Sequence, residues 1–94
     1  MEFTAPAASG FTIYGKSSCP YCDKVKGLLT EYNETFVYVN CDAYLVEDRE
    51  AFLEFIEKLA GREYRTFPMV FESTQFVGGY MDTMKVMLDR EDNK

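Results

Sequence analysis

Two cysteines separated by two residues, Cys19 and Cys22, carry the clearest chemistry in this chain. Between them lie Pro20 and Tyr21, and a proline suits the first turn of a helix, where its missing N–H is not needed. Side chains three positions apart on a helix share a face, so the two sulfur atoms can meet. The spacing therefore predicts thiol–disulfide exchange, in which a thiolate attacks the sulfur of a disulfide.

The position of the pair at a helix start predicts a different role for each sulfur. Free N–H groups and a partial positive charge at a helix N-terminus stabilise a thiolate, so we expect the pKa of Cys19 to lie below the ~8.5 of free cysteine. Lys16, three residues upstream, adds positive charge. Cys22 lies one turn deeper and is expected to be more buried. We therefore predict that Cys19 attacks and that Cys22 resolves the mixed disulfide.

Two other uses of the cysteine pair stay open, a permanent disulfide and half of a zinc site. A structural zinc site needs four Cys or His ligands, whereas this chain has one further cysteine, Cys41, and no histidine. A permanent disulfide is unusual in a reducing compartment. Cys41 ends a predicted strand, where we interpret it as a small, partly buried apolar residue. We expect no metal.

Composition sets limits on the function. The 94 residues fit one domain, with 47% hydrophobic residues to build a core. A net charge of −6 argues against nonspecific nucleic-acid binding, and the lack of histidine removes imidazole catalysis and CxxCH haem attachment. No apolar run approaches the ~20 residues of a membrane helix, and residues 1–10 do not resemble a secretory signal. We expect a cytoplasmic monomer.

The hydrophobic pattern predicts an α/β chain in the order β-α-β-α-β-β-α. After a flexible tail over residues 1–9, we expect strands at 11–14, 35–39, 69–71 and 75–77, the second covered on both faces. A helix starts at residues 17–20, with serines suited to its cap. A loop at 40–45 precedes a second helix that ends at Gly61. A last helix spans Met84 to Leu88 and frays into a charged tail over 89–94. The result is one domain, residues 10–94, with a four-stranded mixed sheet and helices on both faces.

Three blocks of this sequence resemble the glutaredoxin family in its dithiol class. They are the runs at residues 16–22 (KSSCPYC), 65–68 (RTFP) and 78–82 (GGYMD), in the family's order and separations. The resemblance covers nearly the whole chain after residue 10. It implies a thioredoxin-like fold and glutathione as the reductant. It also implies that Pro68 is a cis-proline facing the cysteines, preceded by Phe67 where the family more often has valine.

The resemblance implies a glutathione site around the cysteine pair. It places Lys16 and Arg65 near the glycyl carboxylate and the last block around the γ-glutamyl group. Asp82 could instead be a helix cap, the two glycines a plain turn, Tyr21 ordinary packing and Arg65 a solvated charge. The full predicted set of glutathione-binding residues is Lys16, Tyr21, Arg65, Thr66, Phe67, Pro68, Gly79, Tyr80, Met81 and Asp82.

The predicted function is glutathione-dependent reduction of protein disulfides and of protein–glutathione mixed disulfides, with ribonucleotide reductase as one plausible client. Three alternatives remain: a thioredoxin-type electron donor, an iron–sulfur cluster carrier that uses glutathione as a ligand, and a non-catalytic interaction module. The block Gly78 to Asp82 argues against the first, and the presence of Pro20 and Cys22 against the second. The module ranks last because every position needed for the chemistry is filled.

Overall fold

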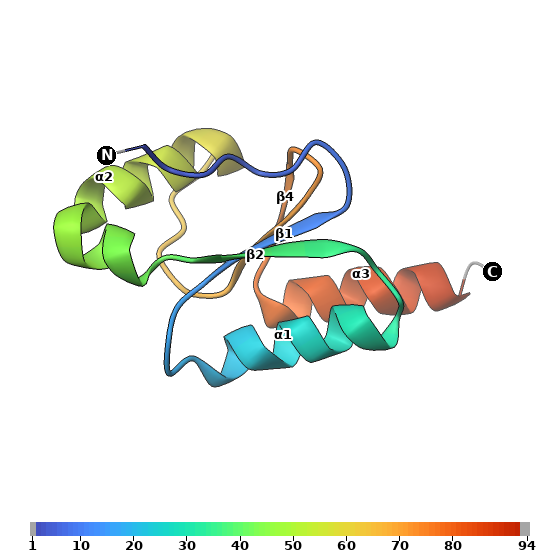
Figure 1. Ribbon diagram of the computed structural model, residues 1–94. Helices are drawn as coiled ribbons and strands as arrows, with labels where there is room; N and C mark the ends of the chain where they lie inside the picture. Colours follow the sequence, from blue (N-terminus) through green and yellow to red (C-terminus); the bar gives the residue numbers. More distant parts are fainter. Residues whose placement is uncertain (1, 93–94) are drawn as a thin grey trace.

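A computed structural model describes residues 2–92 of the chain (Figure 1). The predicted order of seven elements is confirmed. Among residues 2–92, none of the helices combines the length and hydrophobicity required to span a bilayer. The elements are β1 (Phe11–Gly15), α1 (Pro20–Glu31), β2 (Phe36–Asn40), α2 (Asp42–Ala60), β3 (Met69–Glu72), β4 (Gln75–Gly78) and α3 (Tyr80–Asp92).

The sheet has the strand order β2-β1-β3-β4, so β1 and β3 are its central strands. β1 runs parallel to β2 and antiparallel to β3, which pairs antiparallel with β4 through a tight hairpin. Every residue of β1 is buried. Because α1 starts directly after this central strand, the cysteine pair lies at the carboxyl end of the sheet's most buried strand.

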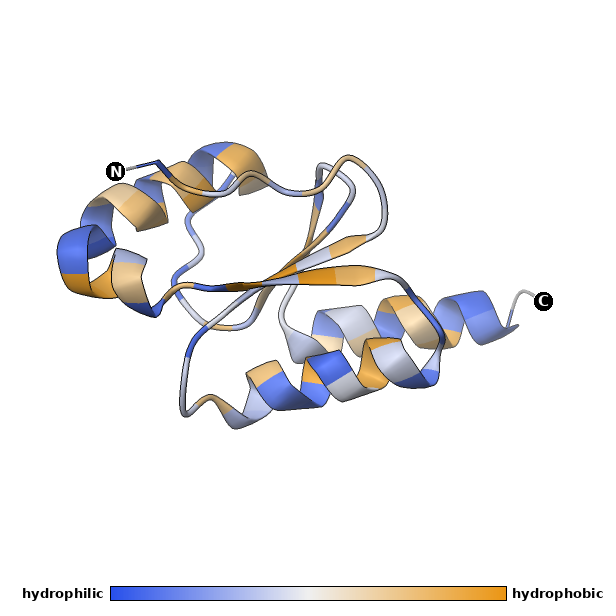
Figure 2. Ribbon diagram, viewed as in Figure 1, coloured by the Kyte–Doolittle hydropathy of each residue, from blue (hydrophilic) through white to orange (hydrophobic). Residues whose placement is uncertain are grey.

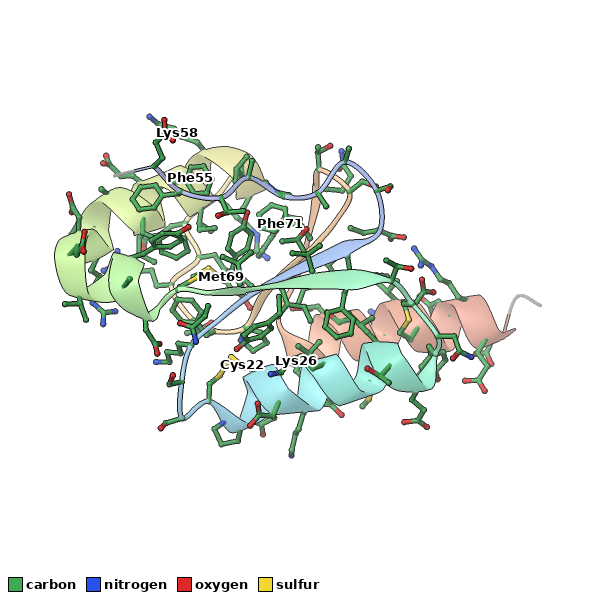
Figure 3. The ribbon with its side chains drawn as sticks, in the orientation of Figure 1. Cys22, Lys26, Phe55, Lys58, Met69 and Phe71 are labelled. Carbon is green, nitrogen blue, oxygen red and sulfur yellow. A yellow bond between two sulfur atoms is a disulfide. The ribbon has the colours of Figure 1, made fainter. Side chains whose placement is uncertain are left out.

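The alternation of side chains across the sheet produces two hydrophobic cores. Phe11, Ile13 and Val70 face α1 and α3, whereas Met69 and Phe71 face α2. This is the period of two expected for strands covered on both sides. Figure 1 shows α2 on one side of the sheet with α1 and α3 on the other, and Figure 2 shows hydrophobic residues concentrated in the strands between them. Met69 and Phe71 are labelled in Figure 3.

The second strand is less covered than predicted. We expected residues 35–39 to be buried on both faces, but β2 is an edge strand and Val37 is 48% exposed. Only Val39 is buried, while Phe36 and Tyr38 are half-buried. An edge strand has a neighbouring strand on one side only, and an apolar run in the sequence does not show whether a strand will be central or at the edge.

The predicted loop at residues 40–45 is wrong, because α2 already begins at Asp42. The side chain of Asn40 accepts the backbone N–H of Asp42 at 2.8 Å, which satisfies one free donor of the first turn. The helix is interrupted at Asp48, whose backbone is non-helical and whose carboxylate accepts the N–H of Ala51 at 3.1 Å. A short first segment thus precedes the longer amphipathic one, which ends at Gly61 as predicted, with a left-handed φ of 80°.

Both ends of the described chain have structure that the sequence did not indicate. Phe3 packs against the rings of Tyr44, Phe52 and Phe55, with centroids 5.0, 5.5 and 5.3 Å away. The sequence did not indicate these contacts, and the mobility predicted for residues 1–9 stays a prediction. At the other end, α3 continues through Asp92 where we expected fraying from residue 89. Residues 1, 93 and 94 lie outside the described residues.

Candidate active site

Cys19 occupies the N-cap position of α1, where we had expected a serine. Its sulfur accepts the backbone N–H of Cys22 at 3.2 Å, and Pro20 follows in the first turn as predicted. Ser17 cannot fill this position because its hydroxyl and N–H are both bonded to Asp42, and Ser18 has a left-handed φ of 54°. The sulfur of Cys19 therefore sits where the positive end of the helix dipole is strongest.

The two cysteines form a disulfide, with Cα atoms 5.2 Å apart. Their exposure differs: Cys19 is 8% exposed and Cys22 is fully buried. Figure 3 shows Cys22 at the start of α1, on the side of the helix that faces the sheet. An incoming thiolate can reach only the outer sulfur, so the structure separates the pair into an accessible and a shielded member.

Cys41 is a third, isolated thiol with a different environment. It is fully buried, its N–H donates to the carbonyl of Gly15 at 2.8 Å, and burial raises its pKa to about 12. A thiol held in its neutral form is a poor nucleophile. We predicted a small, partly buried apolar residue, and Cys41 is instead fully buried, in the core between the sheet and α2.

A pocket of about 250 Å³ opens beside the cysteine pair. It is formed by the first turn of α1, the loop before β3 and the start of α3. The Phe67–Pro68 peptide bond is cis, as the resemblance implied. Eight of the ten residues predicted to bind glutathione line this pocket, together with Tyr64: they are Tyr21, Thr66, Phe67, Pro68, Gly79, Tyr80, Met81 and Asp82.

The two predicted cations are placed differently from the rest. The ammonium of Lys16 lies 5.4 Å from the centroid of the Phe67 ring, so it borders the pocket without lining it. Arg65 is exposed and forms an ion pair with Glu50 at 3.0 Å, and that hydrogen bond raises the pKa of its guanidinium. The structure therefore brings Lys16 beside the predicted site but directs Arg65 to a carboxylate of α2.

Asp82 acts as a cap for α3. Its Oδ2 accepts the N–H of Gly79 at 3.0 Å, which leaves the other carboxylate oxygen for a further partner. The backbone of Gly78 has a φ of 129°, and a Cβ there would lie 2.9 Å from the Cβ of Asp82. Glycine is thus required at Gly78, and the close approach it permits holds the capping carboxylate at the rim of the pocket.

Two features of the site were not predicted from the sequence. Tyr64 lines the pocket, with its hydroxyl directed at Gly79 and its ring 4.8 Å from that of Phe76. Its aromatic character in an otherwise polar segment was the available signal. The second is Asp42, whose carboxylate accepts the N–H of Ser17 at 2.9 Å as well as the Ser17 hydroxyl. This contact fixes the loop before Cys19 to the start of α2.

Comparison with known proteins agrees with this arrangement. The Glutaredoxin family model matches residues 11–77, more than half of the chain. Glutaredoxin 1 of Rickettsia conorii is 36% identical over 67 residues, which cover 71% of this chain and 61% of that protein. The chain thus spans about three fifths of the length of this relative.

Solved glutaredoxin structures have the same fold. The crystal structure of glutaredoxin 1 from Francisella tularensis superposes with a TM-score of 0.73 at 27% identity, covering 89% of this chain and 96% of that one. A buckwheat glutaredoxin–glutathione complex gives 0.69 at 25% identity, covering 84% and 68%. The sheet order, the disulfide at the N-terminus of α1 and the matched family model together show that this chain belongs to the glutaredoxin family, with the Cys19–Cys22 spacing of its dithiol members.

Proposed function

We propose that this protein is a glutathione-dependent thiol–disulfide oxidoreductase. The single observation that carries the proposal is the sulfur of Cys19 at the N-cap of α1, where it accepts the N–H of Cys22 at 3.2 Å. The same hydrogen bond is stronger when the sulfur is an anion, so it favours the thiolate over the thiol. A thiolate that is both stabilised and accessible is the attacking species in disulfide exchange.

The reaction starts from the reduced pair. The Cys19 thiolate attacks one sulfur of a substrate disulfide, a new Cys19–substrate disulfide forms, and the other substrate sulfur leaves as a thiolate that takes a proton from water. Cys22 then loses its proton and attacks the Cys19 sulfur. This step closes the Cys19–Cys22 disulfide, which is the oxidised form seen in the structure, and releases the second substrate sulfur as a thiol.

Two glutathione molecules complete the cycle. The first attacks Cys19, forms a mixed disulfide there and releases Cys22 as a thiol. The second attacks the glutathione sulfur of that mixed disulfide, so glutathione disulfide leaves and the Cys19 thiolate returns. When the substrate is a protein–glutathione mixed disulfide, Cys19 takes the glutathione directly and only the last step follows. Cys22 is then dispensable.

The pocket beside the cysteines has the groups that glutathione requires. The main chain before Pro68 offers an edge for the cysteinyl backbone, and Tyr21 and Tyr80 form walls whose ring centroids are 5.7 Å apart. The first N–H groups of α3 and the free oxygen of Asp82 suit the carboxylate and amine of the γ-glutamyl end. The buckwheat relative was solved as a glutathione complex, which supports the same use of the pocket here.

Lys16 is proposed to meet the glycyl carboxylate from its position over Phe67. Arg65 can bind the glycyl carboxylate only after its ion pair with Glu50 breaks, so we assign it a smaller role in this contact than Lys16. Action as a monomer, a cytoplasmic location and ribonucleotide reductase as a client remain proposals of the same kind.

The test is a pair of cysteine variants in a coupled assay with glutathione, glutathione reductase and NADPH. Cys19→Ser is expected to remove all activity, whereas Cys22→Ser keeps the reduction of a glutathionylated substrate and loses the reduction of a protein disulfide. Turnover with thioredoxin reductase in place of glutathione would contradict glutathione dependence. Activity retained by Cys19→Ser would refute the assigned roles.

A further inference from the structure

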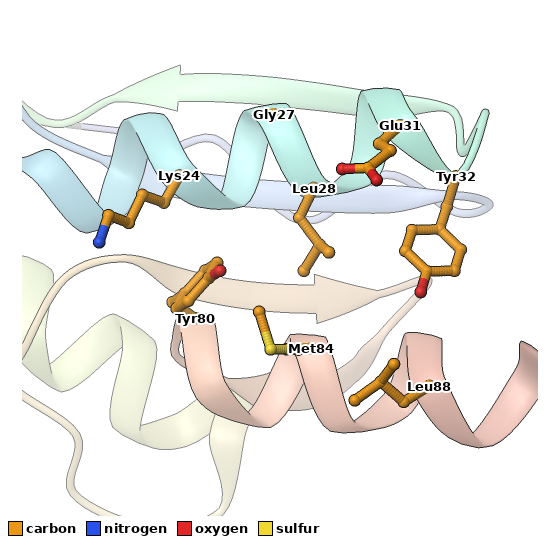
Figure 4. Close-up of a pocket in the computed structure, with 8 residues that line it drawn as sticks. All are labelled: Lys24, Gly27, Leu28, Glu31, Tyr32, Tyr80, Met84 and Leu88. Atoms are coloured by element: carbon orange, nitrogen blue, oxygen red, sulfur yellow. The ribbon is translucent and has the colours of Figure 1, made fainter.

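A second depression, larger than the pocket beside the disulfide, lies between α1 and α3. It has a volume of about 470 Å³. Figure 4 shows Leu28 of α1 and Met84 of α3 directed toward one another between the helices, with Leu88 on α3, Tyr80 toward one end and Tyr32 at the other. Lys24, Gly27 and Glu31 complete the α1 side. We refer to these eight residues as the α1/α3 groove.

The floor of the groove is open to a partner at Gly27. This glycine lies in the interior of α1, where glycine destabilises a helix by about 1 kcal/mol relative to alanine. A Cβ at this position would meet no atom of the described residues within 4 Å, so packing within residues 2–92 does not require a glycine. Leu88, on the opposite wall, is 47% exposed. The exposed side chain of Leu88 and the exposed backbone of Gly27 together allow another polypeptide to approach α1 closely.

The groove is continuous with the candidate active site. Tyr80 lines both the groove and the pocket beside the disulfide. The neighbouring wall of that pocket is Tyr21, and the ammonium of Lys24 lies 4.9 Å from the centroid of the Tyr21 ring. A polypeptide attached to Cys19 therefore meets the groove as its next surface along α1.

The two ends of the groove carry opposite charges. Lys24 lies at the end near the cysteines, and Glu31 lies at the far end beside Glu91, which accepts the Tyr32 hydroxyl at 2.7 Å. Glu31 and Glu91 also line an adjoining polar pocket of about 270 Å³. From Cys19 to Glu31 the helix rises about 18 Å, which about five or six extended residues span.

We propose that the α1/α3 groove binds an extended segment of the protein client next to the cysteine that Cys19 attacks. The segment has an acidic residue close to that cysteine, opposite Lys24, then apolar side chains over Leu28, Met84 and Leu88, then a basic residue at Glu31 and Glu91. This assignment rests on the proposed disulfide exchange and adds a class of client to it. Small disulfides do not reach the groove, so it affects only peptide and protein substrates.

The experiment measures how fast Cys19 captures peptides of defined sequence. The protein is reduced Cys22→Ser, and each peptide carries one cysteine in a mixed disulfide with thionitrobenzoate. The Cys19 thiolate attacks the peptide sulfur, the Cys19–peptide disulfide forms, and coloured thionitrobenzoate leaves as the thiolate. One peptide has Asp beside the cysteine, two leucines and a lysine within the next five positions, and its control has serines for the leucines and exchanged charges. Each is also made with its sequence reversed, and a cysteamine mixed disulfide serves as the small probe.

In either the forward or the reversed sequence, we expect the matched peptide to react about five- to tenfold faster than its control. The reason is that the leucines of the peptide cover the partly exposed side chain of Leu88. Gly27→Leu fills the groove and is expected to abolish this preference, as is Leu88→Asp. Thr30→Leu, at another exposed position of α1 that does not line the groove, is expected to keep the preference. Glu31→Lys is expected to move the preference toward a peptide that ends in glutamate. The small probe reacts at one rate with all of these variants.

Three results would overturn the assignment. Equal rates for matched and control peptides, with normal reaction of the small probe, would refute the groove and leave the proposed function intact. A preference that survives Gly27→Leu would place the peptide elsewhere. A wild-type dimer in sedimentation that becomes a monomer in Gly27→Leu would assign the groove to a second copy. By contrast, a small probe that reacts no faster with Cys19 than with free cysteine would refute the proposed function itself.

Discussion

Replacing Gly78 with alanine is expected to destabilise the protein and to damage the pocket beside the disulfide. Gly78 ends β4 with a φ of 129°, a backbone conformation that L-residues rarely adopt. The added methyl group would also collide with the carboxylate of Asp82, which accepts the N–H of Gly79. The substitution therefore strains the main chain and displaces the cap of α3 together.

The two effects have separate magnitudes. Backbone strain in a sparsely populated region amounts to about 1–3 kcal/mol. Loss of a helix cap adds about 0.5–2 kcal/mol. We expect Gly78→Ala to lower the free energy of unfolding by about 2–4 kcal/mol, a large part of the roughly 5–15 kcal/mol of a typical domain. Gly78→Ala with Asp82→Ala removes the collision with the carboxylate and leaves only the close approach of the two Cβ atoms, so the pair should cost less than the sum of the single changes.

Urea unfolding followed by circular dichroism measures these free energies, and the KM for glutathione reports the pocket. The matched control is Gly27→Ala, a glycine with an ordinary helical φ and open space around it, which should stabilise the protein by about 1 kcal/mol. A Gly78→Ala protein within about 0.5 kcal/mol of the wild type would refute the structural reasoning, since surface substitutions commonly fall in that range.

Two further predictions concern Cys41 and Asp42. The unfolded Cys41 thiol ionises near its ordinary pKa of 9.0, while burial keeps the folded thiol protonated to about 12, so the contribution of Cys41 to stability falls as the pH rises through this interval. Urea unfolding of the wild type and Cys41→Val at several pH values should show a shallower slope in the variant, and equal slopes would contradict this. Asp42→Ala should slow the reaction of Cys19 about tenfold by releasing the loop at Ser17, whereas Asp42→Asn, which keeps an acceptor, should react nearly as the wild type does. Similar rates for Asp42→Ala and Asp42→Asn would show that the contact between Asp42 and Ser17 is not needed. Hydrogen bonds from Ser17 lower the pKa of Asp42, so the stabilising effect of the Asp42 carboxylate is present at neutral pH and is lost only below about pH 3.8.

The elements closest to the cysteines could be predicted from the sequence because local signals agree with the tertiary structure there. A β-rich run ending at Gly15 favours a strand, a proline suits the first turn of α1, and the glycine after α2 tolerates the left-handed φ of a helix end. The helical pattern of α1 stops at Asn33, whose backbone has a left-handed φ of 58°. Local and tertiary preferences coincide at these positions, so no long-range information was needed.

The features that the sequence did not reveal depend on contacts between distant residues. Phe3 reaches Tyr44 across some forty positions, and nothing in the local sequence of the first residues indicates that contact. The start of α2 was missed because its first segment contains Val46, which is 86% exposed and breaks the apolar period. Asn40 accepts the N–H of Asp42 directly before this helix, and an asparagine in this position is easily taken for a turn signal.

The candidate site shows the same division. Most of its residues belong to three short blocks, and the bend at Thr66 and Phe67 and the left-handed backbone at Gly78 accompany their meeting at one pocket. Arg65 was drawn into the predicted set by its place in a block, yet its charge is paired with Glu50 on α2. Pairing of exposed charges depends on side-chain geometry in the folded chain, which a sequence pattern does not record.

The most direct test of the central claim is the pH dependence of alkylation of Cys19. In reduced Cys22→Ser, Cys19 is the accessible thiol, because Cys41 is fully buried and its pKa is raised. The rate of reaction with iodoacetamide follows the thiolate fraction. Stabilisation by the start of α1 predicts a midpoint clearly below the ~8.5 of free cysteine. A midpoint at or above that value would contradict a thiolate held by the helix N-terminus.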